Sequence, residues 1–163
     1  MPMTSEDIHR RLQARFGEAV GQLHTETTDH WIEVDPGRVE EVARYCKEDE
    51  ALRFDSLSSL CGVDAHESLF VVYHLYSYPR RHSAVIKVKV HKAKPVTRTV
   101  TTVWRGANWF ERETYDLLGV RFEGHPDLRR LLLPDDWEGY PLRKEYVFPT
   151  EYGGIDNTRD YGF

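Results

Sequence analysis

The 163-residue sequence predicts an α+β fold in two layers, with helices on one face of a mostly antiparallel or mixed sheet and an extended C-terminal arm. Segments with the apolar period of helices are interspersed with segments of period two, which is typical of strands with one solvated face. Residues 123–163 carry recurrent prolines and no long periodic element. We therefore expect a single domain overall, compact over residues 1–122 and continued by an arm over residues 123–163.

The N-terminal part predicts two helices with a hairpin between them. In the first helix Ile8, Leu12 and Phe16 share one face. In the second, Asp35 is the expected N-cap and Pro36 the first helical residue, because proline loses no hydrogen bond there. The remaining expectations are a cap at Thr4 or Ser5, an end at Gly17, hairpin strands at 20–27 and 31–34, and a buried stripe of Val39, Val42, Ala43 and Cys46.

The middle of the chain predicts a second hairpin. Residues 69–78 are rich in Val, Tyr and Phe, and residues 83–91 alternate between apolar and polar positions. The short connection between them predicts an antiparallel pair. Residues 52–63 have mixed periodicity, from which we expect a short strand, a helical turn and another extended piece.

A third helix is predicted over residues 109–118. Asn108 and Glu111 have the spacing of a capping box, in which each side chain bonds the backbone N–H of the other residue. Gly119 occupies the place of a left-handed stop residue. Further expectations are an inner face of Phe110, Thr114, Leu117 and Leu118, and short strands at 120–122 and 128–132.

The composition argues against several classes of function. Lys and Arg total 22 against 27 Asp and Glu, and this net charge of −5 does not favour nucleic-acid binding. No apolar run approaches the roughly 20 residues of a membrane span, so we expect no direct span. The N-terminus lacks the layout of a signal peptide. Cys46 and Cys61 are expected to be reduced structural thiols.

Sites for metals or catalysis have weak support. The eight histidines show no zinc-binding spacing, so no metal site is expected. Glu113 and Asp116 share one face of the third helix and form, with His125, the one candidate acid–base set. Arg112 precedes Asp116 by four residues and is expected to pair with it, which favours a structural network over catalysis.

The arm is rich in aromatic and basic side chains. Trp, Tyr and Arg dominate the energetics of protein interfaces. We expect an arm ordered by a partner surface, and the alternative is a tail that wraps its own domain. The aromatic residues are Trp137, Tyr140, Tyr146, Phe148, Tyr152, Tyr161 and Phe163, and the basic residues are Arg129, Arg130, Arg143 and Lys144.

A long composite motif resembles a known family. From Ala107 to Lys144 the chain carries, in order, Glu-Arg-Glu, Tyr-Asp, a glycine, Gly-His-Pro, an arginine-rich stretch and Gly-x-Pro-Leu-Arg-Lys. This succession is similar to the 30-kDa subunit, or C subunit, of respiratory complex I, the NADH:quinone oxidoreductase. The resemblance covers nearly the whole chain, and Leu118 and Glu145 depart from it in detail. The matching motif residues are Trp109, Glu111, Arg112, Glu113, Tyr115, Asp116, Gly119, His125, Pro126, Arg129, Arg130, Trp137, Gly139, Pro141, Leu142, Arg143 and Lys144.

The resemblance implies a subunit with no catalytic residue, metal or redox centre of its own. It implies a place in the hydrophilic arm of the complex, peripheral on the cytoplasmic side of the bacterial membrane. FMN, iron–sulfur clusters, NADH and quinone then belong to partner subunits, and the expected partners are the D subunit and neighbouring iron–sulfur subunits. The motif residues become structural: Trp109 and Tyr115 anchor the helix, and the basic residues of the arm donate to the neighbour.

Three other functions stay open on the sequence alone. Membrane-bound nickel–iron hydrogenases and related dehydrogenase complexes contain an equivalent subunit with the same motif. A free-standing acid–base enzyme would use Glu113, Asp116 and His125. A module that binds a small ligand would need a closed apolar pocket.

Overall fold

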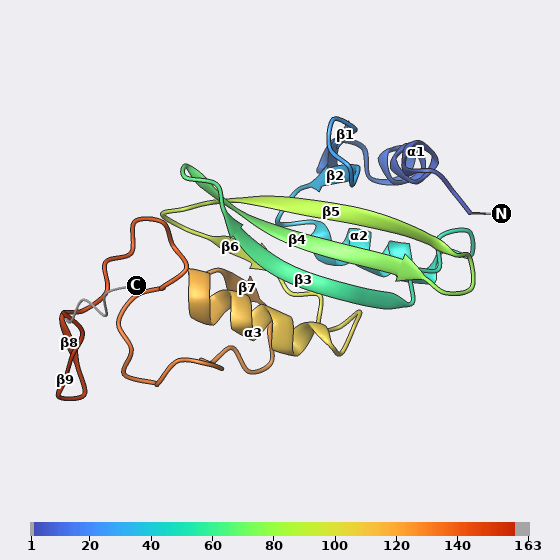
Figure 1. Ribbon diagram of the computed structural model, residues 1–163. Coiled ribbons are helices and arrows are strands. Elements are labelled where there is room, and N and C mark those ends of the chain that lie inside the picture. The colour runs from blue at the N-terminus through green and yellow to red at the C-terminus, as the bar shows by residue number, and fades with distance from the viewer. Residues whose placement is uncertain (1, 159–163) are drawn as a thin grey trace.

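The computed structural model describes residues 2–158, and a five-stranded sheet in the order β1-β2-β5-β4-β3 forms its framework (Figure 1). The centre is the predicted antiparallel hairpin of β4 (Ser68–Ser77) and β5 (His82–His91). β3 (Ser56–Asp64) runs antiparallel to β4 at one edge. On the other side β2 (Trp31–Val34) runs parallel to β5, and β1 (Val20–His24) pairs antiparallel with β2. The sheet is therefore mixed, as predicted.

Within residues 2–158, three α-helices and a 3-10 turn, η1 (Gly17–Ala19), complete the α+β fold. α1 (Ser5–Phe16) packs beside β1, α2 (Val39–Glu48) lies behind the sheet in Figure 1, and α3 (Ala107–Leu118) lies along β3. Their buried side chains join one core with the inward-facing strand residues, so the helices share one face of the sheet, as predicted. This core includes Ile8, Leu12, Val42, Cys46, Ala107 and Leu118 from the helices and Leu60, Val71, Tyr73, Leu75, Ile86 and Val88 from the strands.

Two small ladders lie outside the main sheet. β6 (Val96–Arg98) and β7 (Arg121–Glu123) pair in parallel and flank α3 in the chain, and β7 is the strand predicted at 120–122. β8 (Glu151–Tyr152) and β9 (Ile155–Asp156) form a hairpin in the last part of the described chain. Residues 124–150, all of them described, contain no helix or strand and pass along α3 (Figure 1). Two of the aromatic residues expected to belong to the arm, Tyr161 and Phe163, lie outside the described range.

Helix α1 follows its predicted capping signals, whereas α2 has its predicted buried stripe of Val39, Val42, Ala43 and Cys46 but not its predicted start. The hydroxyl of Thr4 accepts the N–H of Asp7 at 3.3 Å, and Gly17 ends α1 at a φ of 56°. The Asp35 carboxylate accepts the N–H of Gly37 at 2.7 Å and closes a turn. That turn delays the helix to Val39, so the predicted N-cap at Asp35 and first helical residue at Pro36 are wrong.

The prediction for residues 52–63 is wrong as well. Most of this segment is one continuous strand, β3, which begins at Ser56. Its pairing with β4 shifts register between Leu57 and Ser59. Such a bulge breaks the period of two, which explains why the apolar positions suggested mixed structure.

The capping box predicted for Asn108 and Glu111 does not form. α3 begins at Ala107, and no side chain caps it. Glu111 is fully buried, and its carboxylate accepts the backbone N–H of Val100 at 2.7 Å and the hydroxyl of Thr99 at 2.6 Å. Glu111 therefore ties α3 to the turn after β6. The inner face of α3 is Ala107, Glu111, Thr114 and Leu118, whereas Phe110 and Leu117 are half-buried.

Candidate functional site

Helix α3 buries a second, polar face beneath the arm. Arg112 is 7% exposed and Asp116 is 0% exposed. The guanidinium of Arg112 donates from Nε to the carbonyl of Arg129 at 3.3 Å and from Nη2 to the carbonyl of Arg130 at 3.1 Å. The predicted pairing of Arg112 with Asp116 is therefore wrong, because both side chains bind the arm instead.

Asp116 is the main attachment point of the arm. Its Oδ2 accepts three successive backbone N–H groups, those of Leu131 at 3.0 Å, Leu132 at 2.7 Å and Leu133 at 2.9 Å. Its Oδ1 accepts Nη1 of Arg130 at 2.8 Å. Burial opposes ionisation, but these donors hold the pKa of Asp116 below its ordinary value.

The same contacts explain why no strand forms at residues 128–132, contrary to the prediction. A strand sends alternate N–H groups to opposite sides, whereas here consecutive N–H groups converge on one carboxylate. The apolar run Leu131–Leu133 therefore wraps around the side chain of Asp116.

Tyr140, one of the aromatic residues expected in the arm, contacts two arginines and a glycine of the motif. The guanidinium carbons of Arg130 and Arg143 lie 5.7 and 5.0 Å from the centroid of its ring. Gly119 lies against the ring, and a Cβ added there would be 2.5 Å from a ring carbon. With a φ of 77°, Gly119 is the predicted left-handed stop and is also required by this close approach. The Nε of Arg143 donates to the carbonyl of Leu118 at 2.8 Å.

A second attachment point lies at the end of β3. The carboxylate of Asp64 accepts the N–H of Lys144 at 2.8 Å and pairs with Nζ of Lys92 at 2.9 Å. Burial opposes ionisation here too, but these donors lower the pKa of Asp64 to about 2. Lys92 also reaches Glu145 at 2.6 Å. Asp64 could not be identified as a site residue from the sequence, because no local pattern relates it to a residue 80 positions away.

The candidate acid–base set is not assembled. Glu113 is exposed, whereas Asp116 is buried and occupied by the arm. The Nδ1 of His125 accepts the N–H of Asp127 at 3.0 Å, so its Nε2–H donates to the carbonyl of Asn108 at 3.3 Å. Burial lowers the pKa of His125, in keeping with this neutral tautomer. Each member of the set therefore has a separate environment.

The remaining motif residues divide between anchoring and exposed positions. Trp109 is 60% exposed and does not anchor α3, whereas Tyr115 packs edge-on against Tyr140 at 6.4 Å. The exposed motif residues are Pro126, Arg129 and Leu142, and the half-buried ones are Trp137 and Pro141. Gly139 has a φ of 81° and lies against Tyr146. Nζ of Lys144 lies 3.0 Å from Nε2 of His66. For Arg130 and Arg143, the expected donation to a neighbour is corrected to donation within the chain.

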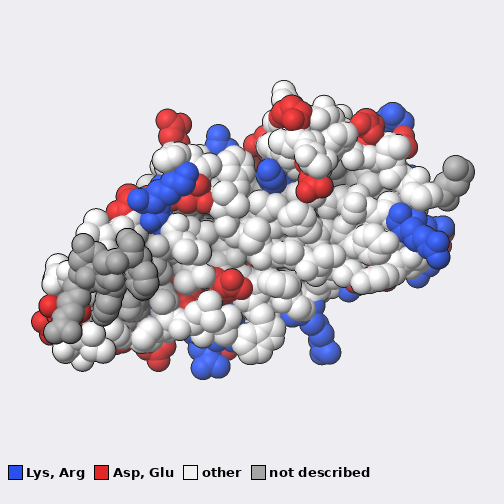
Figure 2. Space-filling view, in the orientation of Figure 1, with Lys and Arg blue, Asp and Glu red and all other residues white. Residues whose placement is uncertain are grey.

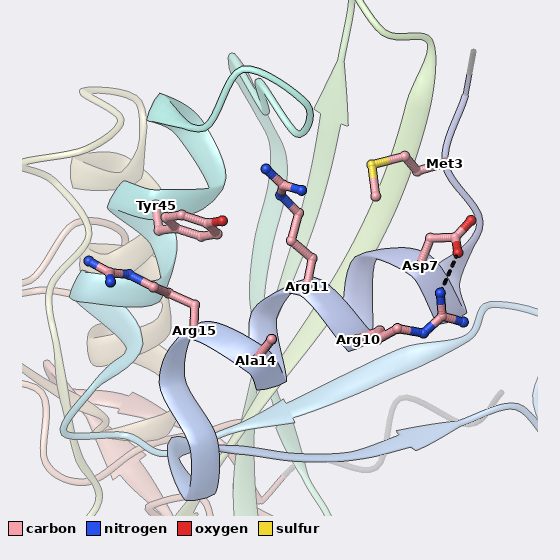
Figure 3. Close-up of a pocket in the computed structure, with 7 residues that line it drawn as sticks. All are labelled: Met3, Asp7, Arg10, Arg11, Ala14, Arg15 and Tyr45. Carbon is pink, nitrogen blue, oxygen red and sulfur yellow. Dashed lines mark hydrogen bonds and ion pairs between the residues drawn. The ribbon is translucent and has the colours of Figure 1, made fainter.

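A shallow groove of about 560 Å³ is lined mainly by α1, with Tyr45 of α2 (Figure 3). α1 lies at the end of the molecule opposite the arm (Figure 1). The arginines of the groove are largely paired: Arg10 contacts Asp7 at 3.2 Å, and Arg11 holds Asp49 through two bonds of 3.0 and 2.8 Å. The motif residues do not line this groove.

Within residues 2–158, no cluster of three or more His, Cys, Asp or Glu could hold a metal. No helix in this range has the length and apolar character to cross a membrane.

Comparisons with known proteins agree with one another. Residues 32–152 match the family model described as "Respiratory-chain NADH dehydrogenase, 30 Kd subunit". A protein from Roseiflexus castenholzii, named as the C subunit of an NADH-quinone oxidoreductase, is 43% identical over 93% of this chain and 88% of its own length. A protein of the same name from Chlorobium phaeobacteroides is 38% identical over 88% of this chain and 89% of its own length.

Solved structures show the same fold. A structure described as the trypsin-resistant fragment (1–134) of Nqo5 superposes with a TM-score of 0.60 and 32% identity, covering 76% of this chain and 98% of that one. A chain of an archaeal membrane-bound sulfane sulfur reductase has a TM-score of 0.71 over 87% of this chain, but its 23% identity shows the fold alone. On the family match and the identities to its relatives, this chain belongs to the family of 30-kDa subunits, or C subunits, of the respiratory-chain NADH dehydrogenase.

Proposed function

We propose that this chain is a non-catalytic assembly subunit of a proton-pumping NADH:quinone oxidoreductase, with its arm against the D subunit and near iron–sulfur subunits. In this proposal FMN, the iron–sulfur clusters, NADH and quinone are bound by partner subunits. The chain itself is peripheral on the cytoplasmic side of the bacterial membrane. Membership of the family and the names of its relatives support this proposal.

The main support for the proposal is that charged motif side chains bind within the chain, whereas large apolar side chains of the arm are exposed. The charged motif side chains Arg112, Asp116 and Arg130 bind within the chain and shape the arm. The arm also turns four large apolar side chains outward. Leu132, Leu142, Val147 and Phe148 are 62, 58, 85 and 62% exposed. Exposed apolar groups on a built segment are typical of a surface that another protein covers.

The sheet offers a second surface of the same kind. Figure 2 shows that the surface over β3–β5 is largely free of Lys, Arg, Asp and Glu in this view. Val63 on β3 and Tyr78 after β4 are 45 and 69% exposed. A subunit enclosed by neighbours would bury both the sheet face and the arm. Neither surface resembles the closed apolar pocket of a small-molecule site.

The test is purification of the chain, tagged at its N-terminus, from gently solubilised membranes. α1 and the arm lie at opposite ends of the molecule (Figure 1), so a tag there leaves the arm free. We expect recovery of flavin and iron–sulfur subunits and NADH:quinone activity in the same fraction. Recovery of a nickel–iron hydrogenase set would keep the assembly role and change the reaction. A chain that is never recovered with redox subunits would contradict the proposal.

A further inference from the structure

The tip of the arm contains a groove that the attachment of the arm does not use. It has a volume of about 700 Å³ and lies beyond both attachment points, next to the β8–β9 hairpin. Its described lining combines three aromatic residues with three carboxylates and contains no Lys, Arg or His. The aromatic residues are Trp137, Tyr146 and Tyr152, and the carboxylates are Asp136, Glu138 and Glu151.

Internal bonds hold the groove in shape. Nη2 of Arg130 donates to the carbonyl of Trp137 at 2.8 Å, which fixes one wall to the Asp116 attachment point. The hydroxyl of Tyr146 donates to the carbonyl of Glu138 at 3.1 Å, and that of Tyr152 donates to the carboxylate of Asp136 at 2.8 Å. Because these walls are already ordered, a partner would bind without the entropic cost of ordering them.

The charges of the groove are uncompensated within the described chain. The ion pairs of the arm use Asp116, Asp127 and Glu145, and none of the three groove carboxylates joins an ion pair within residues 2–158. Carboxylates beside aromatic faces attract a cation both by charge and through the ring quadrupole. The rings of Trp137 and Tyr152 lie 4.9 Å apart, and both belong to this lining.

The groove also holds an unsatisfied donor. Nε1 of Trp137 is buried and has no hydrogen-bond acceptor among the described residues. An indole nitrogen can only donate, so it needs a carbonyl or a carboxylate. In the complex proposed below, a backbone carbonyl of the partner segment is that acceptor.

We propose that this groove binds a lysine- or arginine-bearing peptide segment of a neighbouring protein subunit. The cationic side chain lies against Trp137 and Tyr152 and is neutralised by Glu138 and Glu151, while Val147 and Pro149 of the lining form the apolar rim. This inference rests on the proposed function, since it names the chemistry of the partner that the arm contacts. The acidic lining argues against an anionic lipid surface as the occupant.

The test measures how much chain stays in the purified complex after washes of rising ionic strength. The double charge reversal Glu138→Lys with Glu151→Lys is expected to reduce retention strongly. The double neutralisation Glu138→Gln with Glu151→Gln is expected to weaken it about threefold to tenfold, as for the loss of two exposed ion pairs. The matched control, Glu123→Gln with Asp135→Asn, changes the same charge outside the groove and should match the wild type. Trp137→Phe keeps an apolar ring without the N–H and should weaken retention about threefold.

Zero-length carbodiimide coupling of the wild-type complex identifies the occupant when its cation is a lysine. A cross-link from Glu138 or Glu151 to a lysine of another subunit supports the inference. Retention of both groove variants at the wild-type level would overturn it, even if the wild-type chain co-purifies with the oxidoreductase. If Arg159→Gln lowered retention as much as the groove variants do, the groove would bind an arginine of this chain, and the inference would be overturned. Failure of the wild-type chain to co-purify would overturn the proposed function along with it.

Discussion

The carboxylate of Asp116 on α3 and the guanidinium of Arg130 on the arm lie 2.8 Å apart; the Asp116 side chain is fully buried and that of Arg130 is 16% exposed. Arg130 also donates to the carbonyl of Asp116 at 3.2 Å and to the carbonyl of Trp137 at 2.8 Å. One side chain therefore links the helix, the first turn of the arm and the arm tip. Its position makes the Asp116–Arg130 pair the point at which the arm is most sensitive to substitution.

Replacing Asp116 by Asn should release the arm from α3. The substitution removes the charge that holds Arg130 and one of the two acceptor oxygens, and breaking a buried pair costs about 3 kcal/mol of unfolding free energy. Limited trypsin digestion should then cut faster at Arg129, Arg130 and Arg143, while the domain up to β7 persists. Glu113→Gln is the matched control, because Glu113 is exposed on the same helix. Equal digestion of both variants would contradict the role assigned to Asp116.

Glu111 should make the stability of the chain depend on pH. Burial raises the pKa of Glu111 to about 7, although bonds from Thr99 and Val100 oppose the shift and the charge of Glu40 adds to it. The folded state therefore holds its proton more tightly than the unfolded state, so the stabilisation is present below about pH 4.5 and is lost as pH rises through 7.

The difference between wild type and Glu111→Gln reports this loss. Between pH 5 and pH 8 the unfolding free energy of the wild type should fall relative to the variant, by on the order of 3 kcal/mol at most. Urea denaturation at the two pH values measures it. An unchanged difference between wild type and variant across this range would show that Glu111 does not titrate there.

Gly119→Ala should destabilise the contact between α3 and the arm. A φ of 77° strains an alanine by about 1–2 kcal/mol, and its Cβ would displace the Tyr140 ring from beneath Arg130 and Arg143. Gly106→Ala is the control, because Gly106 has a φ of −62° and an added Cβ there meets nothing within 4 Å. Because these helical backbone angles suit alanine, the unfolding free energy of this control should stay the same or rise by about 0.4–1 kcal/mol. Thermal unfolding of both variants decides the matter.

Arg143→Ala should lower the content of assembled complex more than the turnover of each assembled complex. The arginine donates to the carbonyl of Leu118 and lies over Tyr140, so its loss loosens the arm. Arg121→Ala is the control, because Arg121 is exposed on β7, outside the arm. Quantifying the complex on native gels beside its NADH:quinone activity separates the two effects. Normal content with low turnover would indicate a direct part in the reaction.

The sequence was most informative where local rules agree with tertiary packing. The stripe of Ile8 and Leu12 and the alternation along β5 each predicted an element that the core then buries. Predictions were wrong where a side chain expected to bind its own helix instead binds residues elsewhere in the chain. Glu111 has the spacing of a capping residue but is drawn inward by Thr99 and Val100, because burying an unpaired N–H costs more than leaving a helix end uncapped.

By itself, the sequence determined the α+β class, the helix stripes, the central hairpin, the left-handed stop at Gly119 and the motif that marks the family. These depend on periodicity and on backbone preferences that neighbouring residues set. Only the tertiary structure decided which motif residues meet. Asp116 binds the arm instead of pairing with Arg112, and Asp64 accepts the backbone N–H of Lys144, 80 residues away. Arg130 and Arg143 both lie over the ring of Tyr140. Such pairings follow from the path of a segment without helix or strand, whose hydrogen bonds go to side chains far away in the sequence.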